Sequence, residues 1–391
     1  MRITKIDTFV VDAGWRPWTF VAIRTDEGVV GYGECSDNRN PLAVVGCIRD
    51  LEPMLVGRDP RPIERLNADM YRVVRQSPGG IAQKAIAGID TALWDIKAKA
   101  LGVPVYELLG GPTRDRVRLY WSHCGSTRAR HWEMLGVPPL RSMADIANLG
   151  REVVARGFTA LKTNIVVPGE PATVYGPGFR GDDANAHDLT LSLSLVRHIE
   201  ELIGTFRDAV GPDVDIALDL NFNFKTEGFA RIAKALEPFD LMWLEIDTYA
   251  PEALAWIKAS TTTRVCSGEN LFTARGYKPF LDCQAMDVAM IDVPWNGFTD
   301  AKKVADLASI YEVNIAPHNY YSHLSTLISA HLCAIATNVR IMEIDIDEVP
   351  WKDALLTEPI EIHDGYLTVP TRPGWGADLD EEELARHPWP A

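Results

Sequence analysis

The chain has 391 residues, of which 47% are hydrophobic and 24% are charged, and its formal net charge is −15. This composition is typical of a globular protein with a large core, and the length favours two domains. An acidic chain without a basic block is not expected to bind nucleic acid or an anionic membrane. The chain has no run of 18 apolar residues that would predict a membrane span. Its first residues already alternate between apolar and polar side chains, which is typical of a strand and not of a targeting peptide.

The six cysteines are scattered and include no C-x-x-C pair. Such spacing is typical of reduced cysteines in a protein core and favours a cytoplasmic protein. The expected partner is a small carboxylate. Because the chain is acidic, such an anion needs a local positive centre, which a metal ion and a lysine would provide.

The first 114 residues predict an α+β unit. The stretch RITKIDTFVV alternates between apolar and polar side chains, and FVAIRTDEGVVGYGE reads as a hairpin around Asp26-Glu27-Gly28. Helical periodicity follows at 42–53, 61–75 and 81–101.

From about residue 115 the pattern becomes strand, helix, strand, helix. Strands are predicted near 117–122, 159–164, 214–220, 241–246, 264–269, 286–292, 312–317 and 338–343. Eight βα units close into a (β/α)8-type barrel. The expected organisation is an α+β capping domain of residues 1–114, a barrel of residues 115–345, and a tail of residues 346–391. The tail has strand chemistry at 360–370 and is expected to pack back on the capping domain.

Three consecutive barrel strands end in carboxylates, which are Asp219, Glu245 and Glu269. Parallel strands in one sheet point their carboxyl ends the same way, so these acids are expected to converge. Converging carboxylates repel unless a cation lies between them, and all-oxygen ligands suit Mg²⁺. A single acid at a strand end is usually a helix cap or an ion-pair partner, but three in register favour a metal site.

Other strand ends carry further polar side chains. They are Lys162 and Asn164 on the second barrel strand, Asn221 on the third, Asp292 on the sixth, His318 on the seventh and Glu343 on the eighth. Lys162 and Asn164 are two residues apart and therefore point to the same side. A lysine on one flank and an Asp/His pair on the other would face each other across the proposed metal.

This arrangement resembles the enolase superfamily, specifically its mandelate racemase-like branch and, in style, its sugar-acid dehydratases. The N-terminal stretches TDEGVVGYGE and AIAGIDTALWDIKAKALGVPVYELLGG are similar to the capping domain of that branch. The chain departs from the branch's usual pattern at Asn164, which replaces the second Lys of K-x-K, and at Asn221, which replaces a His of some sugar-acid dehydratases. It also departs at Glu245-Ile246-Asp247, which replaces E-E-P.

The resemblance implies removal of a proton α to a carboxylate, with Mg²⁺ stabilising the charge that develops. In these implied roles Asp219, Glu245 and Glu269 hold Mg²⁺, His318 is the base oriented by Asp292, Lys162 polarises the substrate carboxylate, and Glu343 hydrogen-bonds it. Asn164 and Asn221 are expected to contact the substrate.

Asn164 decides between reaction types. Racemisation needs a base on each face of the α-carbon, and an Asn side chain cannot accept and return a proton at neutral pH. With Lys162 as an electrophile, only His318 remains as a base, which suits β-elimination of water. His318 could itself protonate the departing hydroxyl. A second acid could instead come from Tyr320, Tyr321 or His323, although packing is the more ordinary role for each.

Specificity is expected from the capping domain. Arg16 and Trp18 in the 13–19 loop, Trp295 after the sixth barrel strand, and the 165–188 loop are predicted to close over the substrate. Arg16 could pair with the second carboxylate of a diacid, although an arginine in such a loop is expected to be exposed and solvated.

The sequence therefore predicts a Mg²⁺-dependent dehydratase of a sugar acid, an aldonate or aldarate, that yields a 2-keto-3-deoxy acid and forms a homo-oligomer. An epimerase or cycloisomerase of a sugar acid or lactone is the alternative within the family, because cycloisomerisation also needs one base. A catalytically inactive ligand-binding barrel is the alternative from another class. A metal-dependent hydrolase would rely on histidine ligands, and the chain has no clustered His-x-His.

Overall fold

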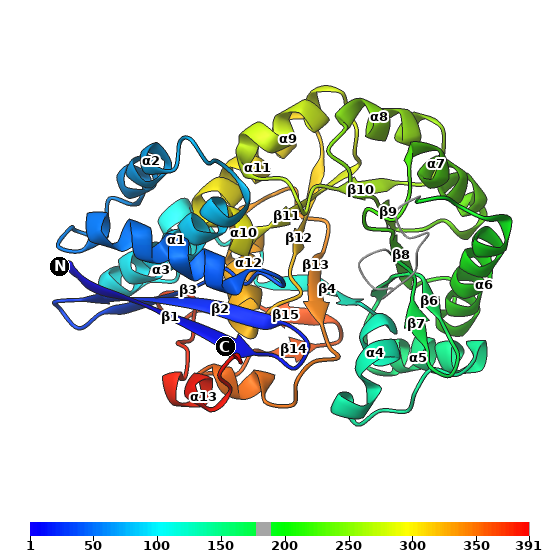
Figure 1. Ribbon diagram of the computed structural model, residues 1–391, viewed down its shortest axis with the longest axis horizontal. Helices are drawn as coiled ribbons and strands as arrows, with labels where there is room; N and C mark the ends of the chain where they lie inside the picture. The colour runs from blue at the N-terminus through cyan, green and yellow to red at the C-terminus, as the bar shows by residue number, and fades with distance from the viewer. Residues whose placement is uncertain (177–188, 391) are drawn as a thin grey trace.

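The capping domain begins with a three-stranded antiparallel sheet (Figure 1). In the computed structural model, which describes residues 1–176 and 189–390, the strands pair in chain order. They are β1 (Ile3–Asp12), β2 (Pro17–Thr25) and β3 (Val30–Glu34). The amide of Thr25 donates to the carbonyl of Val29 across the predicted hairpin turn, and Gly28 has a φ of +79° there. The hairpin expected from the sequence is confirmed.

Three helices cover this sheet, namely α1 (Pro41–Leu55), α2 (Ile63–Val73) and α3 (Gly80–Leu101). The long helix α3 lies directly against β3. A Cβ atom built on Gly31 would lie 2.2 Å from the carbonyl oxygen of Ala92, and one on Gly33 would lie 2.2 Å from that of Gly88. Glycine at these two positions is therefore what allows the helix and the strand to approach so closely.

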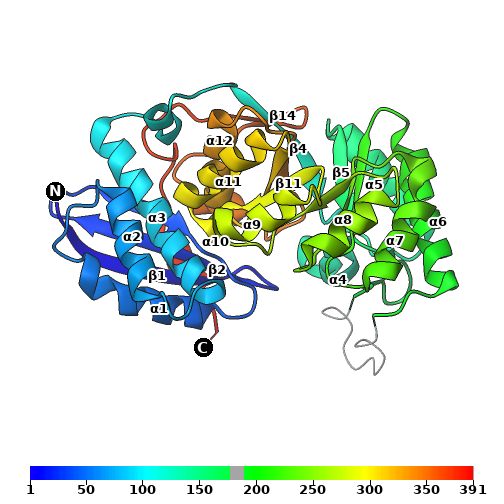
Figure 2. The ribbon, with the colours of Figure 1, turned by 90° about the horizontal axis from the view of Figure 1, so that it is seen from above.

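Within the described residues, eight parallel strands follow one another around a barrel (Figure 1), and a bridge between Ile315 and Val339 closes it. Figure 2 shows the barrel beside the capping domain. The barrel strands are β4 (Arg116–Ser122), β5 (Ala160–Thr163), β8 (Asp215–Asp219), β9 (Trp243–Glu245), β10 (Val265–Ser267), β11 (Val288–Asp292), β12 (Asn314–His318) and β13 (Met342–Asp345). The accompanying helices are α4 (Ser126–Leu135), α5 (Met143–Ala155), α6 (Leu193–Val210), α7 (Thr226–Ala235), α8 (Pro251–Ala259), α9 (Thr273–Asp282), α10 (Val293–Asn296), α11 (Phe298–Ile310) and α12 (His323–Ile335). The predicted fold, a (β/α)8-type barrel with an α+β cap, is confirmed.

The eighth barrel strand differs from its prediction in position. β13 begins at Met342 and pairs with β4, whereas the strand was expected over 338–343. Residues 338–340 instead close the ring on the other side, because the amide of Ile315 bonds to the carbonyl of Asn338 and the amide of Arg340 bonds to the carbonyl of Ile315. As a result, Asp345 rather than Glu343 ends the strand.

The barrel interior is a separate apolar cluster below the strand ends. It consists of Tyr120, Ala160, Ala217, Met242, Trp243, Cys266, Val288, Met290, Ala316 and Ile341, all at most 2% exposed. The rings of Tyr120 and Trp243 meet edge-on with centroids 5.6 Å apart. Alternation along each strand sends these side chains inward. They form a dry floor beneath the polar groups that follow.

The C-terminal tail contacts both domains. Its strands β14 (Ile362–His363) and β15 (Tyr366–Thr368) form a hairpin, and β15 pairs antiparallel with Arg116–Arg118 of β4. This pairing with the barrel differs from the expectation that the whole tail packs on the cap. The reason is that β5 pairs with β4 only at Trp121, so the first residues of β4 have backbone groups to satisfy on that side.

The rest of the tail reaches the cap, and in Figure 1 it ends beside β1 and β2. The indole of Trp375 donates to the carbonyl of Tyr32 at 3.0 Å, and the amide of Trp389 donates to the carbonyl of Val10 at 3.1 Å. Helix α13 (Glu381–Arg386) adds an ion pair of 2.7 Å between Glu381 and Arg24. The tail thus ties the cap to the barrel.

None of the helices in the described ranges has the length and apolarity that crossing a membrane requires. All six cysteines have free thiols, and Cys35, Cys124, Cys266 and Cys333 are buried. This agrees with the expectation of unpaired core cysteines.

Candidate active site

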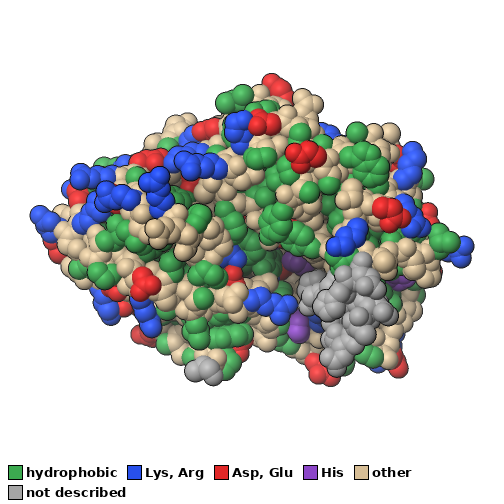
Figure 3. Space-filling model, turned by 45° about the horizontal axis from the view of Figure 1, so that its top comes forward, with side chains coloured by type: hydrophobic (Ala, Val, Ile, Leu, Met, Phe, Trp, Pro, Cys, Tyr) green, Lys and Arg blue, Asp and Glu red, His purple; other side chains and the backbone are tan. Residues whose placement is uncertain are grey.

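Polar side chains from every strand of the barrel meet above its apolar floor, at the carboxyl ends of the strands. Asp219, Glu245, Asp292 and His318 are the last residues of their strands. Figure 3 shows a hollow in the face toward which these strand ends point, with histidine side chains visible in it. The sites of barrel proteins are built at this end of the strands.

The three acids predicted to hold a metal lie on adjacent strands. Asp219 and Glu245 are directly paired in register on β8 and β9, and Glu269 follows the next strand, β10. Asp219 accepts hydrogen bonds from the side-chain amides of Asn164 and Asn221, both at 3.0 Å. These bonds place the two asparagines against Asp219.

The side chains of Lys162 and His318 contact the other two acids. Both oxygens of Glu245 lie 3.0 Å from the ammonium of Lys162, and Glu269 lies 3.2 Å from Nε2 of His318. With the side chains in these positions, no three His, Cys, Asp or Glu residues in the described ranges form a preassembled metal cluster. The residues are nevertheless neighbours in one buried acidic region.

This region carries more negative than positive charge. Burial, opposed by Lys162 and reinforced by Asp219 and Glu269, raises the pKa of Glu245. Burial and Asp247 raise the pKa of Glu269 to about 8. Burial and Asp219 likewise raise the pKa of Asp247 to about 7.

Mutual repulsion of this kind is relieved when a cation binds among the acids. The donors are all carboxylate oxygens, which are the ligands of hard divalent ions. The electrostatics and the donor chemistry therefore fit Mg²⁺ at Asp219, Glu245 and Glu269.

Lys162 is buried between two carboxylates. Its ammonium lies 3.0 Å from Glu245 and 3.0 Å from Glu343, and its side chain is 1% exposed. Although burial opposes the charged form, Glu245 and Glu343 hold the pKa of Lys162 well above its ordinary value. A lysine held protonated in this way is suited to be an electrophile and not a base.

Glu343 is fully occupied by protein donors. It accepts from the hydroxyl of Ser122, from the amide of Asn319 at 2.8 Å and from Lys162. Although burial opposes ionisation, Lys162 and His318 lower its pKa, so the group is an ionised acceptor. An ionised carboxylate cannot donate a hydrogen bond to a substrate carboxylate. The geometry therefore favours a role in holding Lys162 over the predicted direct contact with substrate.

The predicted His/Asp pair is formed. Nδ1 of His318 lies 2.7 Å from Oδ2 of Asp292, which ends the neighbouring strand. Asp292 also accepts from the amide of Trp295 at 2.7 Å and from the hydroxyl of Tyr321 at 2.6 Å. Burial opposes protonation of His318, but Glu269, Glu343 and Asp292 together raise its pKa to about 10.

Arg16 lies at the site but is not exposed as expected. It is 1% exposed, and its Nη2 pairs with Asp345 at 3.1 Å and with Glu348. Its guanidinium also lies over the rings of Trp15 and Tyr320, 4.1 Å and 4.5 Å from their centroids. Two carboxylates and two aromatic rings remove this arginine from solvent, so the expectation of a solvated side chain was wrong.

The two tryptophans predicted to contact the substrate differ in where they lie. Trp295 is 9% exposed, and its ring centroid lies 5.9 Å from that of His318. Its indole donates to the carbonyl of Ser36 at 2.7 Å, so this side chain contacts both the capping domain and the proposed catalytic base His318. Trp18 is 0% exposed and meets Trp351 edge-on at 5.7 Å, which leaves no surface for a substrate. This corrects the predicted contact of Trp18, whose place in β2 turns it into the core of the cap.

The predicted lid is described only in part. Residues 166–167 and 173–174 pair as the two short strands β6 (Val166–Val167) and β7 (Thr173–Val174). Residues 177–188 of the 165–188 loop lie outside the described residues.

The three residues considered as a second acid differ in placement. Tyr321 bonds to Asp292, and the ring of Tyr320 lies 4.8 Å from that of His318. His323 turns away and places Nε2 2.8 Å from Asp353, a side chain that is 86% exposed. His323 is therefore not part of the site.

Sequence reasoning missed three residues here. Asp247 stands two residues after Glu245, as Asn221 does after Asp219, and this alternation could have revealed it. His123 directly follows the first barrel strand, and this place at a strand end could have revealed it. Asp345 was missed because the eighth strand was placed too early.

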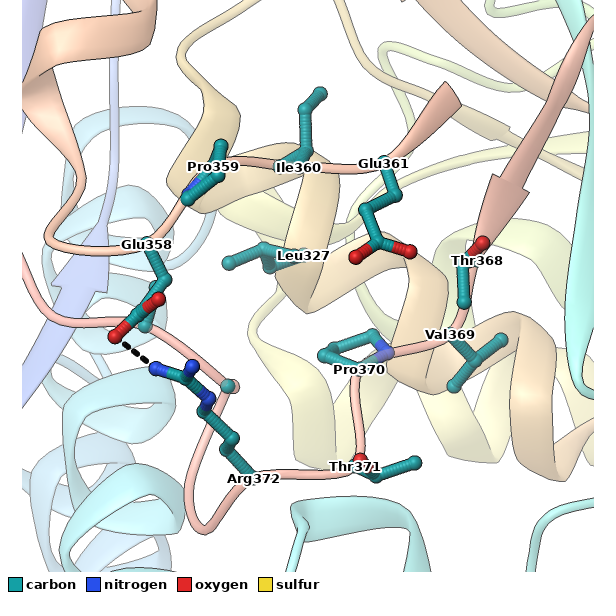
Figure 4. Close-up of a pocket in the computed structure, with 12 residues that line it drawn as sticks. Leu327, Glu358, Pro359, Ile360, Glu361, Thr368, Val369, Pro370, Thr371 and Arg372 are labelled. Carbon is teal, nitrogen blue, oxygen red and sulfur yellow. Dashed lines mark ion pairs between the residues drawn. The ribbon is translucent and has the colours of Figure 1, made fainter. Parts of the chain in front are cut away.

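Another cavity, of about 230 Å³, lies beneath the tail (Figure 4). It is lined by tail residues and by Leu327 of α12, and Glu358 and Arg372 form an ion pair beside it. It includes none of the residues predicted to act on a substrate.

Two family comparisons cover most of the chain. Residues 6–110 match the N-terminal domain of the mandelate racemase / muconate lactonizing enzyme family, and residues 145–383 match the enolase C-terminal domain-like family. Among curated relatives, a D-xylonate dehydratase of Haloferax volcanii is 32% identical over 99% of this chain and 89% of its own length. A D-gluconate dehydratase of Thermoproteus tenax is 31% identical over 96% of this chain and 71% of its own.

Solved structures agree over nearly the full length. A Burkholderia xenovorans protein, provisionally designated an L-alanine-DL-glutamate epimerase and bound to magnesium and fumarate, is 41% identical with a TM-score of 0.95. The similarity covers 99% of this chain and 96% of that one. A member of the enolase superfamily from Salmonella Typhimurium is 26% identical with a TM-score of 0.89, over 99% and 98% of the two chains.

Proposed function

The chain belongs to the mandelate racemase / muconate lactonizing enzyme family of the enolase superfamily, and from this premise we propose that it is a Mg²⁺-dependent dehydratase of sugar acids. The family membership inferred from the sequence is confirmed. One observation carries the proposal: His318 pairs with Asp292, whereas Lys162 lies between Glu245 and Glu343, which hold its pKa well above its ordinary value, and Asn164 replaces the second lysine of K-x-K. The relatives named D-xylonate and D-gluconate dehydratases support an aldonate as the first choice of substrate.

Asp219, Glu245 and Glu269 would hold the metal, which when bound supplies positive charge to the substrate carboxylate as the α-proton leaves. Lys162 presents its ammonium to the same carboxylate. Glu343 keeps that ammonium in place, because Ser122 and Asn319 fix its own oxygens.

His318 takes the α-proton at Nε2. Its Nδ1 faces Asp292, which fixes the tautomer and stabilises the imidazolium that forms. Asp292 is itself held by the Trp295 amide and the Tyr321 hydroxyl, so the ring has one orientation toward the site. Loss of the β-hydroxyl then gives an enol that tautomerises to a 2-keto-3-deoxy acid.

Epimerisation is the second candidate, because the Burkholderia protein carries that designation. It would require a base on the face opposite His318. Asn164 replaces the second lysine of K-x-K, and its side chain is engaged by Ser126 at 2.7 Å and by Asp219 at 3.0 Å. An amide held by two partners and unable to exchange protons argues against this reaction.

The test is a panel of aldonates and aldarates incubated with the enzyme and Mg²⁺, with keto acid detected by semicarbazide. Keto acid should appear with at least one acid and should vanish when the metal is chelated. Exchange of the α-hydrogen in deuterated water without any keto acid would favour the epimerase. Neither exchange nor keto acid with any member of the panel would favour the inactive ligand-binding barrel.

A further inference from the structure

A second His–Asp pair lies at the mouth of the barrel. His123 follows β4, and Asp345 ends β13, the strand paired with β4. Nδ1 of His123 lies 2.9 Å from Oδ1 of Asp345. The construction repeats that of His318 and Asp292, in which a carboxylate ends one strand and an imidazole at the end of the neighbouring strand meets it through Nδ1.

The two pairs differ in accessibility. The side chain of His318 is 5% exposed, whereas that of His123 is 20% exposed. Both interactions of His123 with polar side chains, to Asp345 and to Ser122, use Nδ1. Within the described residues Nε2 of His123 therefore has no protein partner and is available to a ligand.

Asp345 is a firmly held partner. It is 3% exposed, and Arg16 of the cap lies 3.1 Å from its Oδ2. Although burial opposes ionisation, His123 and Arg16 lower the pKa of Asp345. A carboxylate held in this way fixes the orientation of the His123 ring through Nδ1, which leaves Nε2 as the ring nitrogen that can meet a ligand.

The second pair lies close to the proposed base. The ring of Tyr320 touches both imidazoles, with centroids 4.8 Å from His318 and 5.7 Å from His123. Glu343 also links them, since it lies 3.8 Å from Nε2 of His318 and accepts from Ser122, the neighbour of His123. Tyr320 and Glu343 therefore connect the two imidazoles along one wall of the barrel mouth.

The backbone of His123 supports a placed side chain. Its φ is +46°, in the left-handed region that non-glycine residues seldom occupy. Such conformations persist only when the surroundings hold them and are concentrated at functional sites.

We propose that His123 is the acid that protonates the departing β-hydroxyl, a role that rests on the proposed dehydration. His318 takes the α-proton, and the electron pair of that C–H bond forms the double bond between the α- and β-carbons. The β-carbon–oxygen bond breaks with its pair going to oxygen, and the Nε2 proton of His123 joins it, so that water leaves. His123 ends neutral, His318 ends protonated, and exchange with solvent restores both.

The other acids are less suited to this step. The hydroxyl of Tyr321 is engaged by Asp292 at 2.6 Å. Burial raises the pKa of Tyr320, which makes it a poorer donor than an imidazolium near neutral pH. His318 remains the rival, because it could return the α-proton that it takes.

The test compares two leaving groups in His123→Asn and wild type. Asparagine tolerates the left-handed φ but cannot transfer a proton. The substrates are an acid that wild type dehydrates and its analogue with fluorine in place of the β-hydroxyl, because fluoride leaves without being protonated. Loss of water should fall on the order of 10³-fold, whereas loss of fluoride should fall less than about tenfold.

Asp345→Asn provides a second variant that keeps the imidazole. It should slow loss of water by a smaller factor and again spare loss of fluoride. Hydrogen exchange at the α-carbon, which His318 carries out, should persist in both variants, and circular dichroism should show that both are folded.

Three results would overturn the assignment, and they have different meanings. Unchanged loss of water in His123→Asn would return the proton donation to His318. An equal fall for both leaving groups, with a raised KM, would make His123 a binding residue. If wild type dehydrates no acid of the panel, the proposed function fails and this role fails with it.

Discussion

The barrel mouth has two sides that differ in chemistry. The carboxylate side, at the ends of β8, β9 and β10, consists of Asp219, Glu245, Asp247 and Glu269. The imidazole side, from β11 round to β4, consists of Asp292, His318, Asp345 and His123. On the first side burial and neighbouring acids raise the pKa values of Glu245, Asp247 and Glu269. On the second side Asp292 and Asp345 each pair with a histidine.

The difference shows that strand ends in equivalent positions around one barrel can carry side chains suited to two different tasks. A cluster of like charges is suited to hold a cation, and a carboxylate–imidazole pair is suited to move a proton. Lys162 spans the two sides, because its ammonium bonds Glu245 on one and Glu343, next to the imidazoles, on the other.

The largest expected effect comes from removing the base. His318→Asn should lower kcat for keto acid release on the order of 10⁴-fold, because the proposal assigns the α-proton to no other base among the described residues. Calorimetry should find Mg²⁺ affinity nearly unchanged, since the carboxylate side is intact. A matched loss of Mg²⁺ binding would mean that the two sides are not separable and that His318 is structural.

Substitution of a proposed metal ligand should instead impair the carboxylate side. Asp219→Asn removes one charged ligand and should weaken Mg²⁺ binding by about 10- to 100-fold, measured by calorimetry. The stabilisation of the enzyme by Mg²⁺ in thermal unfolding should fall with it. Asp240→Asn, at a side chain that is 87% exposed, is the control and should leave both unchanged. Unaltered Mg²⁺ affinity in Asp219→Asn would refute the assignment of this ligand.

A smaller effect should come from loosening Asp292. Tyr321→Phe removes the 2.6 Å hydrogen bond to Oδ2, which leaves Asp292 more basic and the His318 imidazolium better stabilised. The pKa of His318 should therefore rise. Because the base must be neutral to act, the acidic limb of the profile of kcat/KM against pH should move to higher pH, by about one unit or less.

Tyr311→Phe is the matched control, because its hydroxyl also bonds an aspartate, Asp282, but on the exposed surface. Its pH profile should be that of wild type. A shift to lower pH in Tyr321→Phe would show that the hydroxyl supports the charged pair rather than competing for it.

The sequence was sufficient for most of this organisation. Period-two and helical patterns located the first seven barrel strands, and acids at their ends, such as Asp219 and Glu245, followed from them. What it could not supply was side-chain partnership across distant segments. Arg16 is buried because Asp345 and Glu348, more than 300 residues later, reach it, and no local pattern encodes that contact.

The exact position of the eighth barrel strand was the other feature that the sequence did not reveal. The backbone bonds to β12 at Asn338 and Arg340 and pairs with β4 from Met342 onward. The sequence at 338–343 therefore did not reveal where the strand ends. Asp345, and with it the setting of His123, depended on that small displacement.

The smallest predicted effect concerns a histidine that has no carboxylate. His331 on α12 accepts from the amide of Tyr106 at Nδ1 (3.2 Å) and donates from Nε2 to the carbonyl of Trp375 (3.3 Å). Burial lowers its pKa to about 3, the opposite of the rise at His318. The unfolded chain takes up a proton near the ordinary value of about 6.5, whereas the folded chain does not.

The buried imidazole of His331 therefore does not lower the free energy of unfolding above about pH 6.5. As the pH falls from about 6.5 toward 3, only the unfolded chain binds the proton, so the free energy of unfolding falls by up to about 1.4 kcal/mol per pH unit. His331→Gln should be less stable than wild type at pH 7 in urea unfolding, because it disturbs the contact between barrel and tail. Its stability should, however, decline less steeply between pH 6 and pH 4. Equal slopes for the two proteins would show that burial without a carboxylate partner does not keep this imidazole neutral, and the contrast with His318 would then require another cause.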